Sequence, residues 1–266
     1  MKSHLQTAHL QTAHLQTAHV RTRRLGVRHV AAQIEPWHSS RRLLAVSALL
    51  VLLAVTLVES AAAADLRGRV ILAKNAGGKP SREVRNAQIY FTPRTPIALE
   101  VPAEPFEIVT VRKEFTPRAL TVPVGSTVQF PNEDVILHNV FSVSGKNRFD
   151  LGLYKRGAGK QATFEHPGVV RIFCNVHHSM VAYIIVVETP FHATPNFDGQ
   201  FFLSGLPEGP GTLTVWHERS EPYTRELTLP LAEPLEIQLT VSKPRVPRHT
   251  NKFGKPYARK RSGRAY

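Results

Sequence analysis

Short runs of apolar or alternating residues, separated by Gly and Pro, dominate the chain from residue 66 onwards. Val, Ile, Phe and Thr are frequent in these runs, as they are in strands of a half-buried sheet. The runs predict strands at Leu66–Ala73, Ala87–Thr92, 106–112, 119–124, 126–131, 139–144, 148–154, 161–165, 168–174, 181–188, 226–229 and 235–241. Few segments repeat their apolar residues with the period of a helix, so the predicted fold class is all-β.

The first 64 residues do not follow this strand pattern. A pentad, His-Leu-Gln-Thr-Ala, repeats over His4–Ala18, and we interpret it as low-complexity sequence, with a histidine-rich metal-collecting tract as the alternative. Arg41-Arg42, the apolar run Leu43–Val58 and the small residues up to Ala64 have the form of a secretory signal peptide. The run is shorter than the roughly 20 residues of a membrane-spanning helix. We therefore predict export to the periplasm with cleavage near Ala64; an uncleaved membrane anchor is the alternative.

The formal net charge of +14 comes from the two ends of the chain. Residues 1–42 carry seven Lys and Arg against one acidic residue, and residues 243–266 carry nine against none. Because the rest is close to neutral, we predict no nucleic-acid partner. Residues 243–266 lack hydrophobic periodicity and are predicted to form a basic disordered tail. Such a tail could steer the protein to acidic redox partners or to an anionic membrane surface, or could have no partner.

The residues with the most distinctive chemistry lie between two predicted strands, in the segment Cys174–Met180. This segment holds the only cysteine and one of the two methionines of the chain, in the spacing Cys174-x2-His177-x2-Met180. His138, further upstream, could add a second imidazole. Two imidazoles and a thiolate in a trigonal arrangement, with a weak axial thioether, form the ligand pattern of a blue-copper electron-transfer site. A single cysteine also excludes an intramolecular disulfide.

The region from about Phe106 to Glu188 resembles a cupredoxin of the plastocyanin and amicyanin kind. The motifs that carry the resemblance are Phe115–Asn132, His138-Asn139-Val140 and the Cys-x2-His-x2-Met segment. The resemblance implies a Greek-key β-sandwich, one type 1 copper ion, Cu(I) or Cu(II), and one-electron transfer in an exported protein. Similar chains are often labelled as methylamine utilisation proteins, although nothing in this sequence indicates an amine.

By motif position, the resemblance implies four copper ligands: His138, Cys174, His177 and Met180. It also implies that Asn139 lies outside this ligand set and hydrogen-bonds across to the cysteine loop. His178 follows His177 directly, which leaves open which of the two imidazoles binds. In the family the second loop histidine reaches the surface in an apolar patch. Here the candidates for such a patch are Leu137, Val176 and Val181.

Two flanking segments resemble parts of a carboxypeptidase-regulatory-like β-sandwich. Leu66–Thr92 resembles its opening strands, and Asn196–His217 resembles its middle. We favour one small sandwich made from both segments, with the cupredoxin inserted between them. The alternative is that Leu66–Thr92 adds edge strands to the cupredoxin and 191–242 forms a separate module. The favoured division is a leader and signal peptide over 1–64, first strands over 65–94, a cupredoxin domain over 95–189, the remaining strands over 190–242 and the tail over 243–266.

Together these features predict an exported mononuclear blue-copper protein that carries single electrons between redox partners and is not an enzyme. A copper carrier or sensor without redox shuttling would use the same ligands. An envelope interaction module with a structural copper site is a further alternative, because of the second sandwich. The sequence contains no His-x-His pairs, which argues against a multicopper oxidase.

Overall fold

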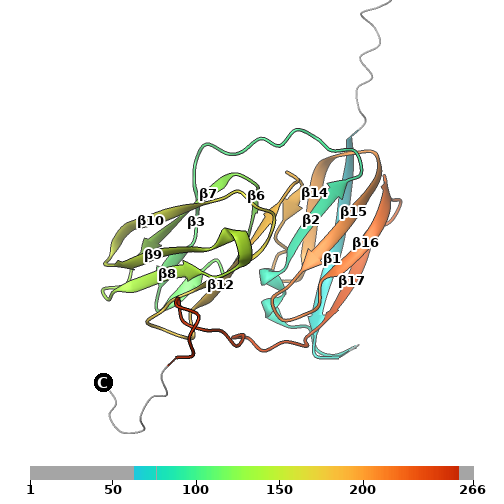
Figure 1. Ribbon diagram of the computed structural model, residues 1–266. Helices are drawn as coiled ribbons and strands as arrows, with labels where there is room; N and C mark the ends of the chain where they lie inside the picture. Colours follow the sequence, from blue (N-terminus) through green and yellow to red (C-terminus); the bar gives the residue numbers. More distant parts are fainter. Residues whose placement is uncertain (1–62, 76, 258–266) are drawn as a thin grey trace, which may run out of the picture. The chain divides into compact units, whose positions relative to one another are not determined.

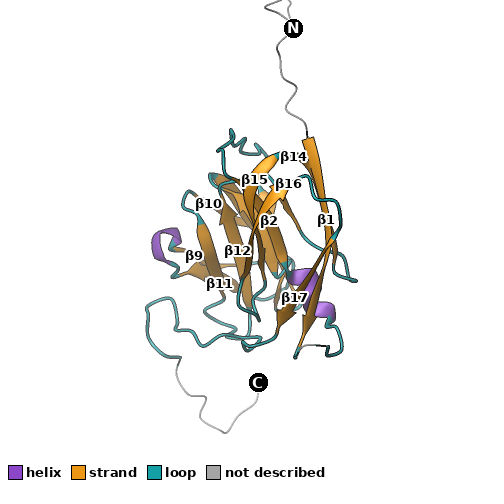
Figure 2. Cartoon of the chain, turned by 90° about the vertical axis from the view of Figure 1, so that its right-hand side faces the viewer, coloured by secondary structure: helices purple, strands orange, loops and turns teal. Residues whose placement is uncertain are grey.

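The computed structural model describes residues 63–75 and 77–257, and within them the predicted all-β class and β-sandwich architecture are confirmed (Figure 1). The described residues form strands β1 to β17 and two short 3-10 helices, η1 (Arg82–Asn86) and η2 (Gly145–Asn147), which are drawn in purple in Figure 2. None of the helices among the described residues has the length and apolar character needed to cross a membrane. The predicted leader and signal peptide lie outside the described residues except for Ala63 and Ala64, which begin β1.

Residues 106–187 form two five-stranded sheets, which we call the central sandwich. One sheet has the order β10-β7-β4-β5, with β3 also paired to β7, and the other has the order β6-β12-β11-β8-β9. The strands are β3 (Phe106–Glu107), β4 (Val109–Val111), β5 (Glu114–Thr116), β6 (Ala119–Pro123), β7 (Ser126–Asn132), β8 (His138–Ser142), β9 (Phe149–Tyr154), β10 (Gly157–Phe164), β11 (Gly168–Phe173) and β12 (Val181–Val187). Their inward side chains, including Phe130, Ile172 and Ile184, form one buried core that also contains Cys174 and Met180.

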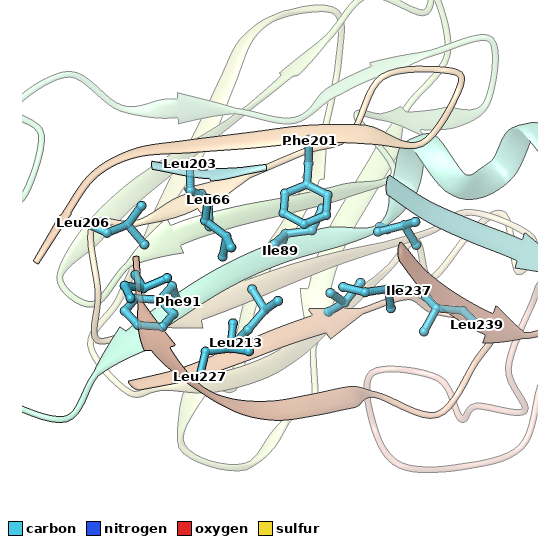
Figure 3. Packing of buried hydrophobic residues seen from close by; sticks show 14 of the residues in the cluster. Leu66, Ile89, Phe91, Phe201, Leu203, Leu206, Leu213, Leu227, Ile237 and Leu239 are labelled. Atoms are coloured by element: carbon cyan, nitrogen blue, oxygen red, sulfur yellow. The ribbon is translucent and has the colours of Figure 1, made fainter. Parts of the chain in front are cut away.

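The remaining strands form a second pair of sheets, which we call the flanking sandwich. One sheet has the order β14-β1-β17 and the other β13-β2-β15-β16. The strands are β1 (Ala63–Ala73), β2 (Gln88–Pro93), β13 (His192–Ala193), β14 (Gln200–Pro207), β15 (Gly209–Trp216), β16 (Tyr223–Leu229) and β17 (Leu235–Thr240). Figure 3 shows their apolar side chains packed into a core of their own. Strands that precede the central sandwich in sequence thus pair with strands that follow it.

An apolar cluster and a buried ion pair join residues of the two sandwiches. The rings of Tyr183 and Trp216 lie 5.1 Å apart in a cluster that includes Phe141 and Phe173. Beside it, Arg118 Nε donates to both carboxylate oxygens of Glu218, at 2.6 and 2.7 Å. Burial raises the pKa of Glu218 more than the Arg118 guanidinium lowers it. Because the Glu218 carboxylate is almost fully buried, its charged form depends on the Arg118 guanidinium. The pair therefore links the two sandwiches.

His217 is buried next to this ion pair and is held as a neutral imidazole. Its Nδ1 accepts the backbone N–H of Arg219 at 3.1 Å, and its Nε2 donates to the carbonyl of Glu83 at 3.0 Å. A proton on Nδ1 would face the N–H of Arg219. Burial is the main cause that lowers the pKa of His217. The fold therefore favours the uncharged ring at this position.

Residues 243–257, which we call the C-terminal strap, contain neither a strand nor a helix. The predicted disordered tail differs from the structure over these residues, because specific contacts hold them against the sandwiches. The Arg118 side chain donates to the carbonyl of Arg245, and the ring of His249 stacks on Phe173 with 4.1 Å between centroids. Single contacts of this kind leave no hydrophobic periodicity, so they could not be predicted from the sequence. Residues 258–266 lie outside the described part of the chain.

Candidate metal centre

Strand pairing brings together the two segments that hold the candidate ligands. The Cys174–Met180 loop joins β11 to β12, and Phe173 pairs with Phe141 of β8 and with Val181 of β12. Because β8 runs antiparallel to β11, continuing this register by two residues sets Asn175 opposite Asn139. His138, the first residue of β8, therefore lies at the same end of the sheet as the loop.

Three side chains form a compact group at this end of the central sandwich. The Sγ of Cys174 lies 3.8 Å from Nδ1 of His138 and 3.8 Å from Nδ1 of His177. Among the residues that the structure describes, these three are the group of His, Cys and acidic side chains able to hold a metal ion, with their ligand atoms all within 4.8 Å of one another. His138 and Cys174 are fully buried and His177 is partly exposed.

The spacing of the three atoms fits a common first-row metal ion. Bonds of roughly 2.0–2.1 Å to imidazole nitrogen and 2.3 Å to thiolate sulfur, as in zinc sites, place the two ligand atoms about 3.8 Å apart when they subtend 120°. Both nitrogen–sulfur distances here equal this value. Both distances are therefore compatible with one ion bound by all three side chains. A thiolate with two imidazoles is the donor set of blue-copper sites.

Asp134 fixes the orientation and tautomer of the His138 ring. Its Oδ2 lies 2.9 Å from His138 Nε2, and its two oxygens accept the backbone N–H groups of Arg112 and Lys113 at 2.7 and 2.8 Å. Burial alone would raise the pKa of Asp134, but these backbone hydrogen bonds and the His138 ring together lower it. An ionised carboxylate requires the proton of the ring on Nε2, so Nδ1 presents its lone pair to Cys174. This role of Asp134 was not predicted from the sequence, because the backbone groups of Arg112 and Lys113 that it binds lie in a distant turn.

His177 is also suited to bind metal as a neutral ring. Burial lowers its pKa, and the neighbouring His138 lowers it further. Its ring centroid lies 4.7 Å from that of His138. His178, by contrast, is exposed, lies outside the three-residue group and contacts Tyr257 with 3.5 Å between ring centroids. Of the two adjacent histidines, the structure brings His177 to the cysteine.

Asn139 links β8 to the cysteine loop by a hydrogen bond. The backbone N–H of Asn175 donates to Asn139 Oδ1 at 3.3 Å, which links the residue after Cys174 to the residue after His138. The Nδ2 group of Asn139 donates to Asp150 Oδ1 at 2.7 Å and to the carbonyl of Gly152 at 3.0 Å. Asn139 is buried and thus ties the cysteine loop to β8 and β9.

Met180 closes the loop at its other end. Its side chain is buried in the same core cluster as Cys174, and its backbone N–H donates to the carbonyl of His177 at 3.0 Å. This turn places a thioether in the apolar shell of the cysteine. Met180 as an axial ligand remains a prediction.

The surface next to His177 is apolar but differs in part from the expected patch. Leu137 and Val176 are about half exposed, as expected for a patch. Val181 is buried, because it begins β12 and packs against Phe141 and Phe173, so its assignment to the patch was wrong. The loop before His138 also carries Val135, which is 85% exposed.

Comparisons with known proteins give matches at the level of structure only. No protein-family model matches the sequence, and no curated protein matches it. The chain is similar to a Cu-containing nitrite reductase (NirK) from Thermus scotoductus SA-01, at 28% identity and a TM-score of 0.32, over 36% of this chain and 26% of that one. It therefore spans about a quarter of the length of that enzyme.

Two smaller proteins match over almost their whole length. A purple cupredoxin from Nitrosopumilus maritimus is 24% identical over 31% of this chain and 99% of its own, with a TM-score of 0.28. A reduced mutant form of amicyanin is 23% identical over 37% of this chain and 98% of its own, with a TM-score of 0.30.

Proposed function

We propose that this protein is an exported mononuclear type 1 copper protein that carries single electrons between redox partners and does no substrate chemistry. The observation that carries the proposal is the buried group of Cys174 Sγ and two imidazole Nδ1 atoms at 3.8 Å, on neighbouring strand ends. Thiolate and thioether donors select copper over the harder divalent cations. A copper ion supplies a reversible one-electron couple when bound in such a site.

The residues of the site act by holding their positions. His138 is oriented by Asp134, and the Cys174 loop is tied to β8 through Asn139. Electron transfer is fast when the ligands keep nearly the same positions in both oxidation states. In this proposal the two sheets and these hydrogen bonds therefore serve electron transfer by limiting movement of Cys174, His138 and His177.

The partly exposed edge of His177 is the proposed exit for the electron. Val135, Leu137 and Val176 are exposed on the loop that precedes His138 and the loop that carries His177, and in this proposal they form the apolar surface on which a redox partner docks. We expect Val176→Ala to slow electron transfer to the physiological partner without changing the visible spectrum. Transfer kinetics identical to those of the parent protein would contradict this docking surface.

Copper binding itself can be tested directly. Addition of copper to the purified protein is expected to produce an intense thiolate-to-copper absorption band that is absent in Cys174→Ser. His177→Ala should also lose the band, whereas His178→Ala should keep it. A parent protein without the band, or a His178→Ala variant that loses it while His177→Ala keeps it, would contradict the assignment.

A copper carrier is the second candidate, because a partly exposed ligand such as His177 also suits transfer of the ion itself. A reversible midpoint potential with fast electron self-exchange supports the electron carrier. Rapid release of copper to an acceptor protein, without reversible electrochemistry, supports the ion carrier.

Export is part of the proposal and rests on the signal-like residues before Ala64. We expect the mature protein in the periplasm, and cell fractionation with N-terminal sequencing tests this. Ala64 of β1 is buried and pairs with Leu206 of β14, so a cleavage that leaves Ala64 in the mature protein would preserve this pairing.

A further inference from the structure

The C-terminal strap runs from the flanking sandwich to the loop that holds Cys174. In Figure 1 it is the dark red segment that follows β17. At its start, Lys243 Nζ donates to the carbonyl of Ser220 at 2.9 Å. Further along, the His249 ring stacks on Phe173 with an angle of 6° between the ring planes. Tyr257 contacts the ring of His178 at the other end of the strap.

Between these two anchors, Lys252 completes a closed ring of hydrogen bonds around the base of the site. Its backbone N–H donates to Asn175 Oδ1 at 3.2 Å, and its Nζ donates to Asp150 Oδ2 at 2.6 Å. Asp150 Oδ1 accepts Asn139 Nδ2 at 2.7 Å, and Asn139 Oδ1 accepts the N–H of Asn175 at 3.3 Å. The ring therefore contains four residues: Lys252, Asn175, Asn139 and Asp150.

Two members of this ring directly follow candidate ligands in sequence. Asn175 follows Cys174 and Asn139 follows His138. A displacement of either ligand segment would therefore break a bond in the ring. Lys252 bonds to one member through its backbone and to another through its side chain, so it holds both ligand segments from outside the central sandwich.

We propose that Lys252 is a positioning residue of the metal centre, which clasps the cysteine loop to β8 and β9 through Asn175 and Asp150 and slows the loss of the bound ion. The inference rests on the proposed copper site. Residues that orient metal ligands in this indirect way commonly change metal affinity 10- to 100-fold when they are removed.

The charge of Lys252 gives the clasp a second effect. Its ammonium group pairs with Asp150, whose carboxylate otherwise leaves a negative charge beside Asn139. The pair is partly buried, with the Lys252 side chain 25% exposed, so its interaction is only partly screened by solvent. Removal of the positive charge should favour the more highly charged oxidised ion and lower the midpoint potential.

The test compares Lys252→Met and Lys252→Arg with the control Lys255→Met in the full chain. Lys255 belongs to the same strap and is exposed; its backbone N–H donates to Asn251 Oδ1, and its carbonyl accepts the backbone N–H of Asn251. Each variant is loaded with copper, and the rate of copper loss to excess chelator, the visible spectrum and the midpoint potential are measured. We expect at least tenfold faster loss and a lower potential in Lys252→Met, partial rescue in Lys252→Arg and parent-like behaviour in Lys255→Met.

If Lys252→Met and Lys255→Met lose copper at the same rate and have the same midpoint potential, the proposed role of Lys252 is refuted, while the proposal of a copper site still stands. A parent protein without a thiolate-to-copper band would instead refute the proposed function. In the metal-free protein, amide hydrogen exchange at Asn175 provides an independent readout. The Asn175 amide should exchange faster in Lys252→Met than in Lys255→Met, and equal exchange rates would also count against the clasp.

Discussion

Substitution of Asp134 by Asn is the sharpest test of how the His138 ring is held. The carboxylate accepts three N–H groups, from Arg112, Lys113 and His138, at 2.7, 2.8 and 2.9 Å. An amide has one oxygen, so its NH₂ group must face at least one of these donors. The variant therefore loses at least one charge-assisted hydrogen bond, each worth about 1.5–3 kcal/mol.

The structure indicates two separate consequences of this loss. Arg112 and Lys113 have φ values of 54° and 59°, a left-handed conformation that costs non-glycine residues about 1–3 kcal/mol each. The Asp134 carboxylate offsets part of this cost, so the metal-free variant should be less stable by roughly 1.5–3 kcal/mol. When the ring of His138 is no longer fixed, metal affinity should fall about 10- to 100-fold, or about 1.4–2.8 kcal/mol.

The assay is competition for Cu(I) with a chelator, combined with urea unfolding of the metal-free protein. Glu133→Gln is the matched control, because Glu133 is the adjacent acidic residue and its side chain is exposed. We expect Glu133→Gln to behave as the parent protein in both assays. Copper affinity of Asp134→Asn within twofold of the Glu133→Gln value would refute the argument that Asp134 sets the tautomer and orientation of the ligand.

Three further predictions concern the fold. Glu218→Gln leaves the Arg118 guanidinium without its buried counter-charge and should lower the free energy of unfolding by about 3 kcal/mol in urea titrations; a change below about 0.5 kcal/mol would contradict the role given to this pair. The lowered pKa of His217 means that its contribution to stability is complete above the unfolded-state value of about 6.5 and is lost as the pH falls below it, by at most about 1.4 kcal/mol per pH unit. His217→Gln should therefore reduce the loss of stability between pH 8 and pH 5.5, and an unchanged pH dependence would exclude this histidine as its source. At Gly159, φ is +77° and a Cβ would overlap the carbonyl of Phe130, so Gly159→Ala should destabilise the protein by at least about 2 kcal/mol, and a urea midpoint equal to that of the parent would show that the backbone relaxes.

Strands were predicted well from the sequence where buried positions alternate with exposed ones or follow one another without a break. They were predicted poorly where most positions are exposed. The whole of β12 is buried, and its run of Val and Ile is unmistakable. The first half of β10 is exposed and contains Gly157 and Gly159, so the prediction began only at residue 161. The turn between β4 and β5 consists of Arg112 and Lys113, which are not typical turn residues, and the predicted strand ended at residue 112, so that β5 was missed.

In the candidate site, the residues that were predicted lie close together in sequence, and those that were missed depend on distant contacts. Cys174 and His177 share one short loop, so their spacing alone indicated a metal site. The role of Asp134 depends on a turn more than twenty residues earlier, and that of Lys252 on a segment 77 residues after Asn175. Contacts between residues so far apart in sequence leave no periodicity or short motif from which they could be predicted.

The order of the strands has a consequence for how the chain is completed. Strand β1 lies between β14 and β17, and Gly68 pairs with Leu235, so the first described strand gains its second neighbour only from the last one. The central sandwich is continuous in sequence and can form earlier, and its folding shortens the loop that the flanking sandwich must close. A chain cut before β17 would keep every candidate copper ligand but leave one edge of β1 unpaired, a surface prone to aggregation. Such a cut would also remove Lys252, so it would be expected to threaten both the solubility of the protein and its retention of the metal.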